Sequence, residues 1–176
     1  GSPGRDWNVA TGMVIEGKAG FQIMGDWAKG EFTAAGKVPG VDYYCAATPS
    51  NNGYLYNVDS FIFYKSSDPD KQAGQKLLAK LMMGKNFQKV FNLYKGSIPA
   101  RLDVSMDEFD KCAKTSNADI KTAGAKGGLV PSFAHGMAQG NTMKAALQDI
   151  ITEHFNSDMS SVDAANALAD SVLANM

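Results

Sequence analysis

Strand-like and helix-like patterns occupy different parts of this sequence, and their arrangement limits the folds that the chain can adopt. Three short stretches with strand signals lie within residues 18–65, and the clear helical patterns begin after them. A doubly wound sheet normally needs repeated strand–helix units, and only fragments of such units are visible here. The sequence therefore predicts an α/β fold that is one part of a larger α/β design.

The strand signals come from apolar runs that are rich in aromatic and β-branched residues. The second run stops at Pro49, and the third surrounds a single polar pair. We expect strands in three stretches: KAGFQIMGDW (18–27), VDYYCAATP (41–49) and YLYNVDSFIFYK (54–65).

Two amphipathic patterns end the chain. Residues 138–154 and 160–176 both repeat apolar side chains at helical spacing. Asn141 is the predicted N-cap of the first helix, and Ser160 or Ser161 that of the second. Because the two helices follow each other closely, we expect an antiparallel pair.

Two further helical patterns precede that pair. In residues 66–84, Ser67 or Asp68 can act as the N-cap, and Pro69 suits the first turn. The apolar stripe of this helix consists of Leu77, Leu78, Leu81 and Met82, and Gly84 is expected to end it. A shorter helix, NFQKVFNLYKG (86–96), closes at Gly96.

Composition excludes several classes of function. The chain has 176 residues, a formal net charge of -1 and 44% hydrophobic residues, which fits one domain or slightly more. It has no apolar run of about 18 residues, the length that a membrane-spanning helix needs. Basic and aromatic residues are not concentrated in one stretch, so we expect no nucleic-acid partner.

The sequence also lacks the motifs of common enzymes. His135 and His154 are the only histidines, and no GxSxG, HExxH or GxxxxGK[ST] motif occurs. Cys45 and Cys112 have neither a CxxC partner nor a histidine at ligand spacing, which excludes the zinc and redox-motif interpretations. We expect no enzyme, no metal site and no cofactor. The cysteine spacing alone leaves a disulfide and two buried thiols equally open.

Five polar or aromatic residues that interrupt apolar segments suit a neutral polyol: Trp7, Trp27, Asp59, Lys95 and His135. Sugar hydroxyls both donate and accept hydrogen bonds, and the ring faces carry C–H patches. A sugar site therefore combines flat aromatic surfaces with charged groups that make charge-assisted hydrogen bonds.

Each of these residues also has a structural interpretation. Trp7 and Trp27 fit a core position, since tryptophan in a small domain is usually buried. Asp59 is equally suited to a structural pairing, because a buried carboxylate is costly without a partner. Lys95 can interact with the C-terminal dipole of its helix, and His135 can be a core histidine bonded to the backbone.

The order of several sequence blocks resembles one protein family. GKAGFQIMGDWAKGEF, YCAATPS, YNVDSFIFYK, FNLYKGSIPARLDV and GLVPSFAHGMA follow one another ahead of the two C-terminal helices. This succession is similar to the C-terminal portion of periplasmic solute-binding proteins of bacterial ABC sugar importers (extracellular solute-binding protein family 1). Within that family it is most similar to the glucose/mannose-binding branch, and the resemblance covers nearly the whole chain.

The resemblance implies a two-lobed type II periplasmic-binding-protein fold that closes on one monosaccharide and presents it to a membrane permease. It implies sugar-facing roles for Trp27 in GDWA, Asp59 in NVDS, Lys95 in YKGSIPAR and His135 in AHGM. Trp7 falls where this branch often has a second aromatic wall. Lys95 would then end a helix whose last turn points into the cleft.

Family members are considerably longer than this chain, and the N-terminal lobe is missing from it. By resemblance, residues 1–58 and 100–176 form the C-terminal lobe, and residues 59–99 form a crossover that packs on the N-terminal lobe. A chain without that lobe exposes apolar residues such as Leu77, Leu81 and Phe91, which favours self-association or completion by another chain. The opening GSPGRDW looks like a cleavage scar, so we expect native sequence upstream to have been cut away or to be absent.

Export to the periplasm supplies an oxidising compartment, so the resemblance also implies a Cys45–Cys112 disulfide. The alternative to sugar binding is an interaction module, or an independent domain, whose likeness to the family is only architectural.

Overall fold

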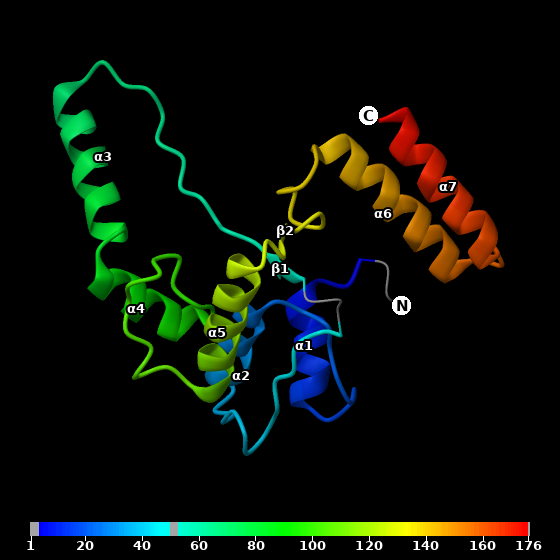
Figure 1. Ribbon diagram of the computed structural model, residues 1–176, viewed down its shortest axis with the longest axis horizontal. Coiled ribbons are helices and arrows are strands. Elements are labelled where there is room, and N and C mark those ends of the chain that lie inside the picture. Colours follow the sequence, from blue (N-terminus) through cyan, green and yellow to red (C-terminus); the bar gives the residue numbers. More distant parts are fainter. Residues whose placement is uncertain (1–3, 50–52, 176) are drawn as a thin grey trace.

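The computed structural model describes residues 4–49 and 53–175, which form helices around a small parallel sheet (Figure 1). In chain order the elements are α1 (Trp7–Ile15), the 3-10 helix η1 (Asp26–Ala28), α2 (Lys29–Ala34), β1 (Tyr54–Tyr56), α3 (Pro69–Met82), α4 (Lys85–Lys95), α5 (Lys111–Ala125), β2 (Leu129–Pro131), α6 (Asn141–Asn156) and α7 (Ser161–Ala174). Among the described residues, no helix has the length and apolar character to cross a bilayer.

The sheet consists of two strands that run parallel. β1 pairs with β2 from Tyr54 opposite Leu129 to Tyr56 opposite Pro131. Helix α5 leads into β2 and packs against both strands, and the Tyr54 hydroxyl lies 2.6 Å from the Ser116 hydroxyl of α5. The predicted mixture of helices and strands is therefore confirmed. The patterns described above did not indicate α5, because Ile120 is its only large aliphatic residue.

Most of the predicted strand residues do not form strands. Residues 18–27 are irregular until η1 begins, and residues 41–49 contribute only an isolated bridge, Pro39–Tyr43. After β1, residues 57–65 have no strand partner in the described part of the chain. A strand needs the backbone groups of a neighbour, and apart from the Pro39–Tyr43 bridge the described residues place none beside these stretches.

The helix predictions agree more closely with the structure. Asp68 caps α3 by accepting from the Asp70 and Lys71 backbone N–H groups, and Ser160 caps α7 by accepting from that of Asp163. Helix α6 begins one residue earlier than expected, with Gly140 as its N-cap and Asn141 as its first residue. Helices α6 and α7 pack as the predicted antiparallel pair (Figure 1).

Glycine residues separate and end the two middle helices. Helix α3 stops at Met82, and Gly84 acts as the N-cap of α4 instead of closing α3. Helix α4 ends at Lys95, and Gly96 follows with φ 89°, in the left-handed region that glycine adopts without steric cost.

The described core is small, and much apolar surface remains exposed. The chain exposes 12335 Å², whereas a folded monomer of 18.7 kDa exposes about 8,300 Å² by the usual size scaling. Leu77, Leu81 and Phe91 are 70%, 58% and 39% exposed, as expected for a chain without the second lobe. The segment between β1 and α3 crosses open space in Figure 1 and exposes Phe61 and Ile62.

Two contacts tie α5 to the N-terminal part of the chain. Cys112, near the start of α5, forms a disulfide with Cys45, with 5.7 Å between the Cα atoms, so the implied pairing is confirmed. The Lys29 ammonium of α2 is buried and lies 2.6 Å from the carboxylate of Asp110, the N-cap of α5. Burial raises the pKa of Asp110, but bonds from Lys29 and from the Ala113 N–H outweigh it and leave the pKa below its usual value.

Helices α2 and α4 contact each other through the backbone atoms of Gly30 and of the end of α4 at Lys95 and Gly96. A Cβ atom added to Gly96 would lie 2.6 Å from the Gly30 nitrogen, and one added to Gly30 would lie 2.8 Å from the Lys95 carbonyl oxygen. Both distances are too short for real Cβ contacts, and backbone atoms cannot move aside as a flexible side chain can. Glycine at positions 30 and 96 therefore sets how closely the two helices approach.

We expect Gly96→Ala to destabilise the fold by about 2 kcal/mol or more, from the positive φ together with the backbone clash. Gly74→Ala is the matched control. Gly74 lies within α3 with no atom near its would-be Cβ, so alanine should stabilise the helix by about 0.5–1 kcal/mol. Urea denaturation of both variants measures the difference, and equal stability for the two would contradict the close-approach argument.

Candidate functional site

Four of the five predicted site residues lie in two contacting pairs, which come from four separate segments of the chain. Trp27 belongs to η1, Asp59 follows β1, Lys95 ends α4, and His135 lies in the turn after β2. Lys95 forms an ion pair with Asp59, and the Trp27 ring contacts the His135 ring. His135 is the last of the groups that lower the pKa of Asp59, so the two pairs lie near each other.

The Lys95–Asp59 pair is open to solvent on the aspartate side. The Asp59 side chain is 63% exposed and that of Lys95 is 32% exposed. The Asn57 side-chain amide donates to the other oxygen of the Asp59 carboxylate, at 3.1 Å. The hydrogen bond from Lys95 holds the pKa of Asp59 below its usual value, so this carboxylate stays ionised in mildly acidic solution.

The Trp27 and His135 rings meet edge to face. Their centroids are 5.0 Å apart and their planes are inclined at 86°. The Ser132 hydroxyl holds the imidazole at Nδ1, 2.6 Å away, which leaves Nε2 for another partner. The indole also covers Gly25, where an added Cβ would lie 2.2 Å from a ring carbon. The glycine thus gives the indole the space that it occupies.

Trp7 is not brought into either pair. It is the first residue of α1, and its side chain remains partly exposed. Its carbonyl oxygen accepts bonds from the Thr11 hydroxyl and the Gln22 side-chain amide, so its described hydrogen bonds fix the local backbone. Within residues 4–49 and 53–175, the indole of Trp7 makes no ring contact.

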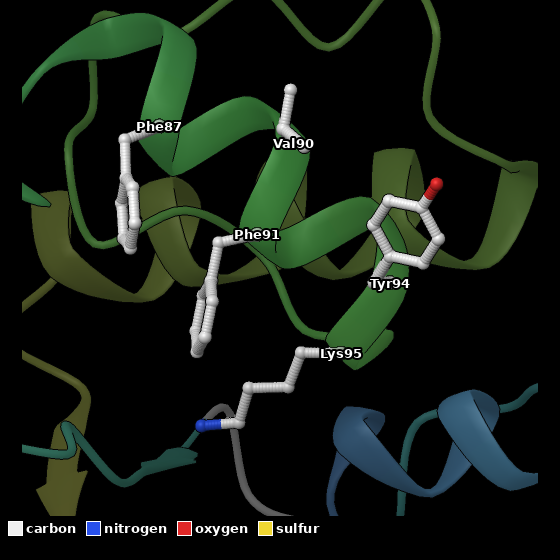
Figure 2. A pocket seen from close by; sticks show the side chains of 5 residues that line it. All are labelled: Phe87, Val90, Phe91, Tyr94 and Lys95. Carbon is white, nitrogen blue, oxygen red and sulfur yellow. The ribbon is translucent and has the colours of Figure 1, made fainter.

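An aromatic surface adjoins the Lys95 end of the site. A shallow, open pocket of about 520 Å³ is lined by Phe87, Val90, Phe91, Tyr94 and Lys95. Figure 2 shows the Phe87 and Phe91 rings side by side on one face of α4, with the end of the Lys95 side chain below the Phe91 ring. The ring centroids of the two phenylalanines are 5.5 Å apart, and the Lys95 ammonium lies 5.7 Å from that of Phe91.

The sequence analysis missed Asp26, which connects two of the predicted site segments. Its carboxylate accepts a hydrogen bond from the Ile98 backbone N–H at 3.0 Å, across 72 positions of sequence. Burial raises its pKa, while the bond from Ile98 and the charges of Lys29 and Lys95 act in the opposite direction without cancelling the rise. Its position directly before Trp27 in GDWA was the feature of the sequence that could have identified Asp26 as a site residue.

Among the described residues, no cluster of His, Cys, Asp or Glu could hold a metal ion.

We expect Lys95→Met to raise the pKa of Asp59 toward its usual value, because the bond from Lys95 is the largest cause of the lowered pKa. A carboxylate whose pKa is lowered by folding adds stability above its unfolded pKa and loses it as pH falls through the folded pKa. For an exposed pair this contribution is about 0.5 kcal/mol or less.

Carboxyl NMR titration of Asp59 measures the pKa shift directly. Lys89→Met is the control, since Lys89 lies on the same helix but pairs with Glu108. An Asp59 pKa that is the same in wild type and in Lys95→Met would show that the pair does not persist in solution.

The sequence of this chain is similar to those of several known proteins. No family model matches the chain. It is 48% identical over 170 residues to a probable sugar-binding periplasmic protein of Brucella suis, an alignment that covers 96% of this chain and 40% of that protein. A probable sugar-binding periplasmic protein of Rhizobium meliloti is 45% identical (96% and 41% covered), and an ABC transporter extracellular-binding protein of Pyrococcus horikoshii is 36% identical (85% and 33%).

The chain thus spans about 40% of the length of the first two of these relatives. Their names describe binding proteins and not enzymes. Along nearly its whole length, the chain is similar to one part of sugar-binding periplasmic proteins and of extracellular binding proteins of ABC transporters.

Proposed function

We propose that this chain is the C-terminal portion of a periplasmic sugar-binding protein that serves an ABC importer, and that its ligand is a glucose- or mannose-like monosaccharide. The observation that carries the proposal is the gathering of Trp27, Asp59, Lys95 and His135 into two linked pairs from four separate segments. The names of the similar proteins support the same class of function.

The chemistry of the two pairs suits a sugar. An ionised Asp59 accepts from hydroxyl groups and the Lys95 ammonium donates to them, so adjacent hydroxyls can bind to the pair at once. His135 adds Nε2, and Trp27 adds an apolar ring surface for the C–H groups of the sugar. Trp7 is the second aromatic wall in this proposal.

The proposed lobe division accounts for part of the exposed apolar surface. Residues 1–58 and 100–176 form the C-terminal lobe, and residues 59–99 cross to an N-terminal lobe that would cover the exposed side of α3 and the unpaired stretch 57–65. The end of the proposed crossover lies against the C-terminal lobe again, because Gly96 packs on Gly30. Lys95 therefore lies where the chain re-enters the C-terminal lobe, which is the place for a ligand between lobes.

The remaining parts of the proposal follow from this class. A membrane permease of the ABC importer receives the sugar, and the Cys45–Cys112 disulfide suits an oxidising periplasm. The second candidate, an interaction module, is favoured by the large exposed apolar surface. Sugar binding that depends on Lys95 separates the two.

In the complete protein, we expect Lys95→Ala and His135→Ala each to weaken binding of the preferred sugar. The loss of one charge-assisted hydrogen bond corresponds to a change of about 10- to 100-fold in affinity. Calorimetry with glucose, mannose, galactose and xylose measures this. Lys89→Ala, on the same helix as Lys95 and paired with Glu108, should leave affinity unchanged. Unaltered affinity in both site variants would remove these residues from the site.

The chain by itself should bind the same sugar only in the millimolar range or more weakly. Two-lobed proteins gain affinity by enclosing the ligand and removing water from its polar contacts, and half a cleft leaves one ring face solvated. Titration of this chain, monitored by amide resonances, checks the expectation. A micromolar dissociation constant would mean that the site is complete without a second lobe.

A further inference from the structure

Asp26 is the one described carboxylate that connects the segment of Trp27 to the segment of Lys95. It precedes Trp27 in the chain, and its carboxylate accepts from the backbone N–H of Ile98, three residues after Lys95. The backbone N–H of Trp27 is the last of the groups that lower the pKa of Asp26. The Asp26 side chain thus holds the turn after Lys95 against its own turn.

This contact differs from those of other aspartates that accept backbone N–H groups. Asp68 and Asp110 accept from residues two or three positions ahead and so cap their own helices. The bond from Ile98 to Asp26 spans 72 positions and joins two different parts of the chain. Loss of a helix cap weakens one helix, whereas loss of this bond changes how two segments lie relative to each other.

The bond acts together with the glycine contact between α2 and α4. Gly30 and Gly96 set the distance of approach, and bonds from Ser97 to Asn92 and from Ala100 to Gln88 hold the following turn against α4. The Ile98 N–H lies just beyond Gly96, so its bond to Asp26 ties that turn to the segment of Trp27. The bond thus adds a directional link between the end of α4 and the turn that carries Trp27.

We infer that Asp26 is a positioning residue of the proposed sugar site, whose carboxylate holds the turn after Lys95 against the turn that carries Trp27. This inference rests on the proposed function for its effect on sugar binding. The link between the two turns itself does not depend on that function.

Groups from three elements interact electrostatically with Asp26. Lys29 of α2 and Lys95 of α4 act on it electrostatically, and it acts in turn on Tyr54 of β1. Because burial raises its pKa, Asp26 takes up a proton at a higher pH than an exposed aspartate. A protonated carboxyl is the weaker acceptor for the Ile98 N–H. The link should therefore loosen as pH falls through this pKa.

The first measurement follows the Ile98 amide proton of this chain by NMR, from about pH 7 to pH 3, the range that brackets raised and ordinary aspartate pKa values. In wild type the resonance should shift as Asp26 titrates, and in Asp26→Asn that shift should be absent. Asp68→Asn, which changes a helix cap, should retain it. An Ile98 shift that persists in Asp26→Asn, or no shift in wild type, would overturn the link.

The second measurement is sugar affinity in the complete protein. Asp26→Ala should weaken binding about 10-fold, whereas Asp26→Asn, which keeps an oxygen that can accept from Ile98, should stay within about threefold of wild type at neutral pH. The affinity of wild type should also fall between neutral and acidic pH by more than that of Asp26→Asn. A merely structural role predicts neither the rescue by asparagine nor the change in the pH profile.

The outcomes separate the inference from the proposed function. If wild type binds no sugar but Ile98 titrates with Asp26, the link stands, and the proposed function fails together with the positioning role. If wild type binds sugar and Asp26→Ala binds it equally well, the positioning role is wrong while the proposed function stands.

Discussion

The close backbone contact between α2 and α4 is the constraint on which the arrangement of the candidate site depends. Gly30 and Gly96 have no side chains to hold the helices apart, so the end of α4 comes down on the start of α2. Trp27 lies just before α2, and Lys95 is the last residue of α4. The two segments that carry these residues are therefore neighbours because of backbone sterics, and Asp26 adds a directional hydrogen bond to the same junction.

Two lysine–aspartate pairs in this protein show how burial changes the role of the same chemistry. The Lys29 ammonium is almost completely buried and lies against Asp110, whose other bonds cap α5. Removing Asp110 would leave the buried charge of Lys29 unpaired, so this pair is structural. The Lys95–Asp59 pair is open on the aspartate side and adds little to stability. Hydroxyl groups of a ligand can therefore reach it without dismantling the fold.

The exposed apolar side of α3 has the same explanation as the unpaired residues 57–65. Helix α3 lies away from the sheet, and the stretch that follows β1 crosses open space before it (Figure 1). Both belong to the part of the chain proposed to cross to another lobe. The described core depends on alanines, a few larger residues and the Cys45–Cys112 disulfide. Such a core supports the site segments but leaves the apolar faces of α3 and α4 for a partner to cover.

The sequence by itself determined helices α3, α4, α6 and α7 and the types of site residue. Asp68, Pro69, Gly96 and Ser160 act through contacts within a few residues, so their roles in beginning and ending helices were readable from local pattern. The choice of Asp59, Lys95 and His135 came from side-chain chemistry and from the resemblance to a family. Whether these residues contact a sugar stays a prediction.

Only the tertiary structure decided which segments meet. The stretches 18–27 and 41–49 have strand composition but no neighbouring strand among the described residues, and strand formation depends on that neighbour and not on propensity alone. Helix α5 went unnoticed because Ile120 is its only large aliphatic residue. Trp7 lies outside the ring pair and the ion pair, and Asp26 lies at the contact between α2 and α4. Both positions have the same physical reason. Contacts across many positions of sequence depend on how the backbone packs, and no local pattern encodes that packing.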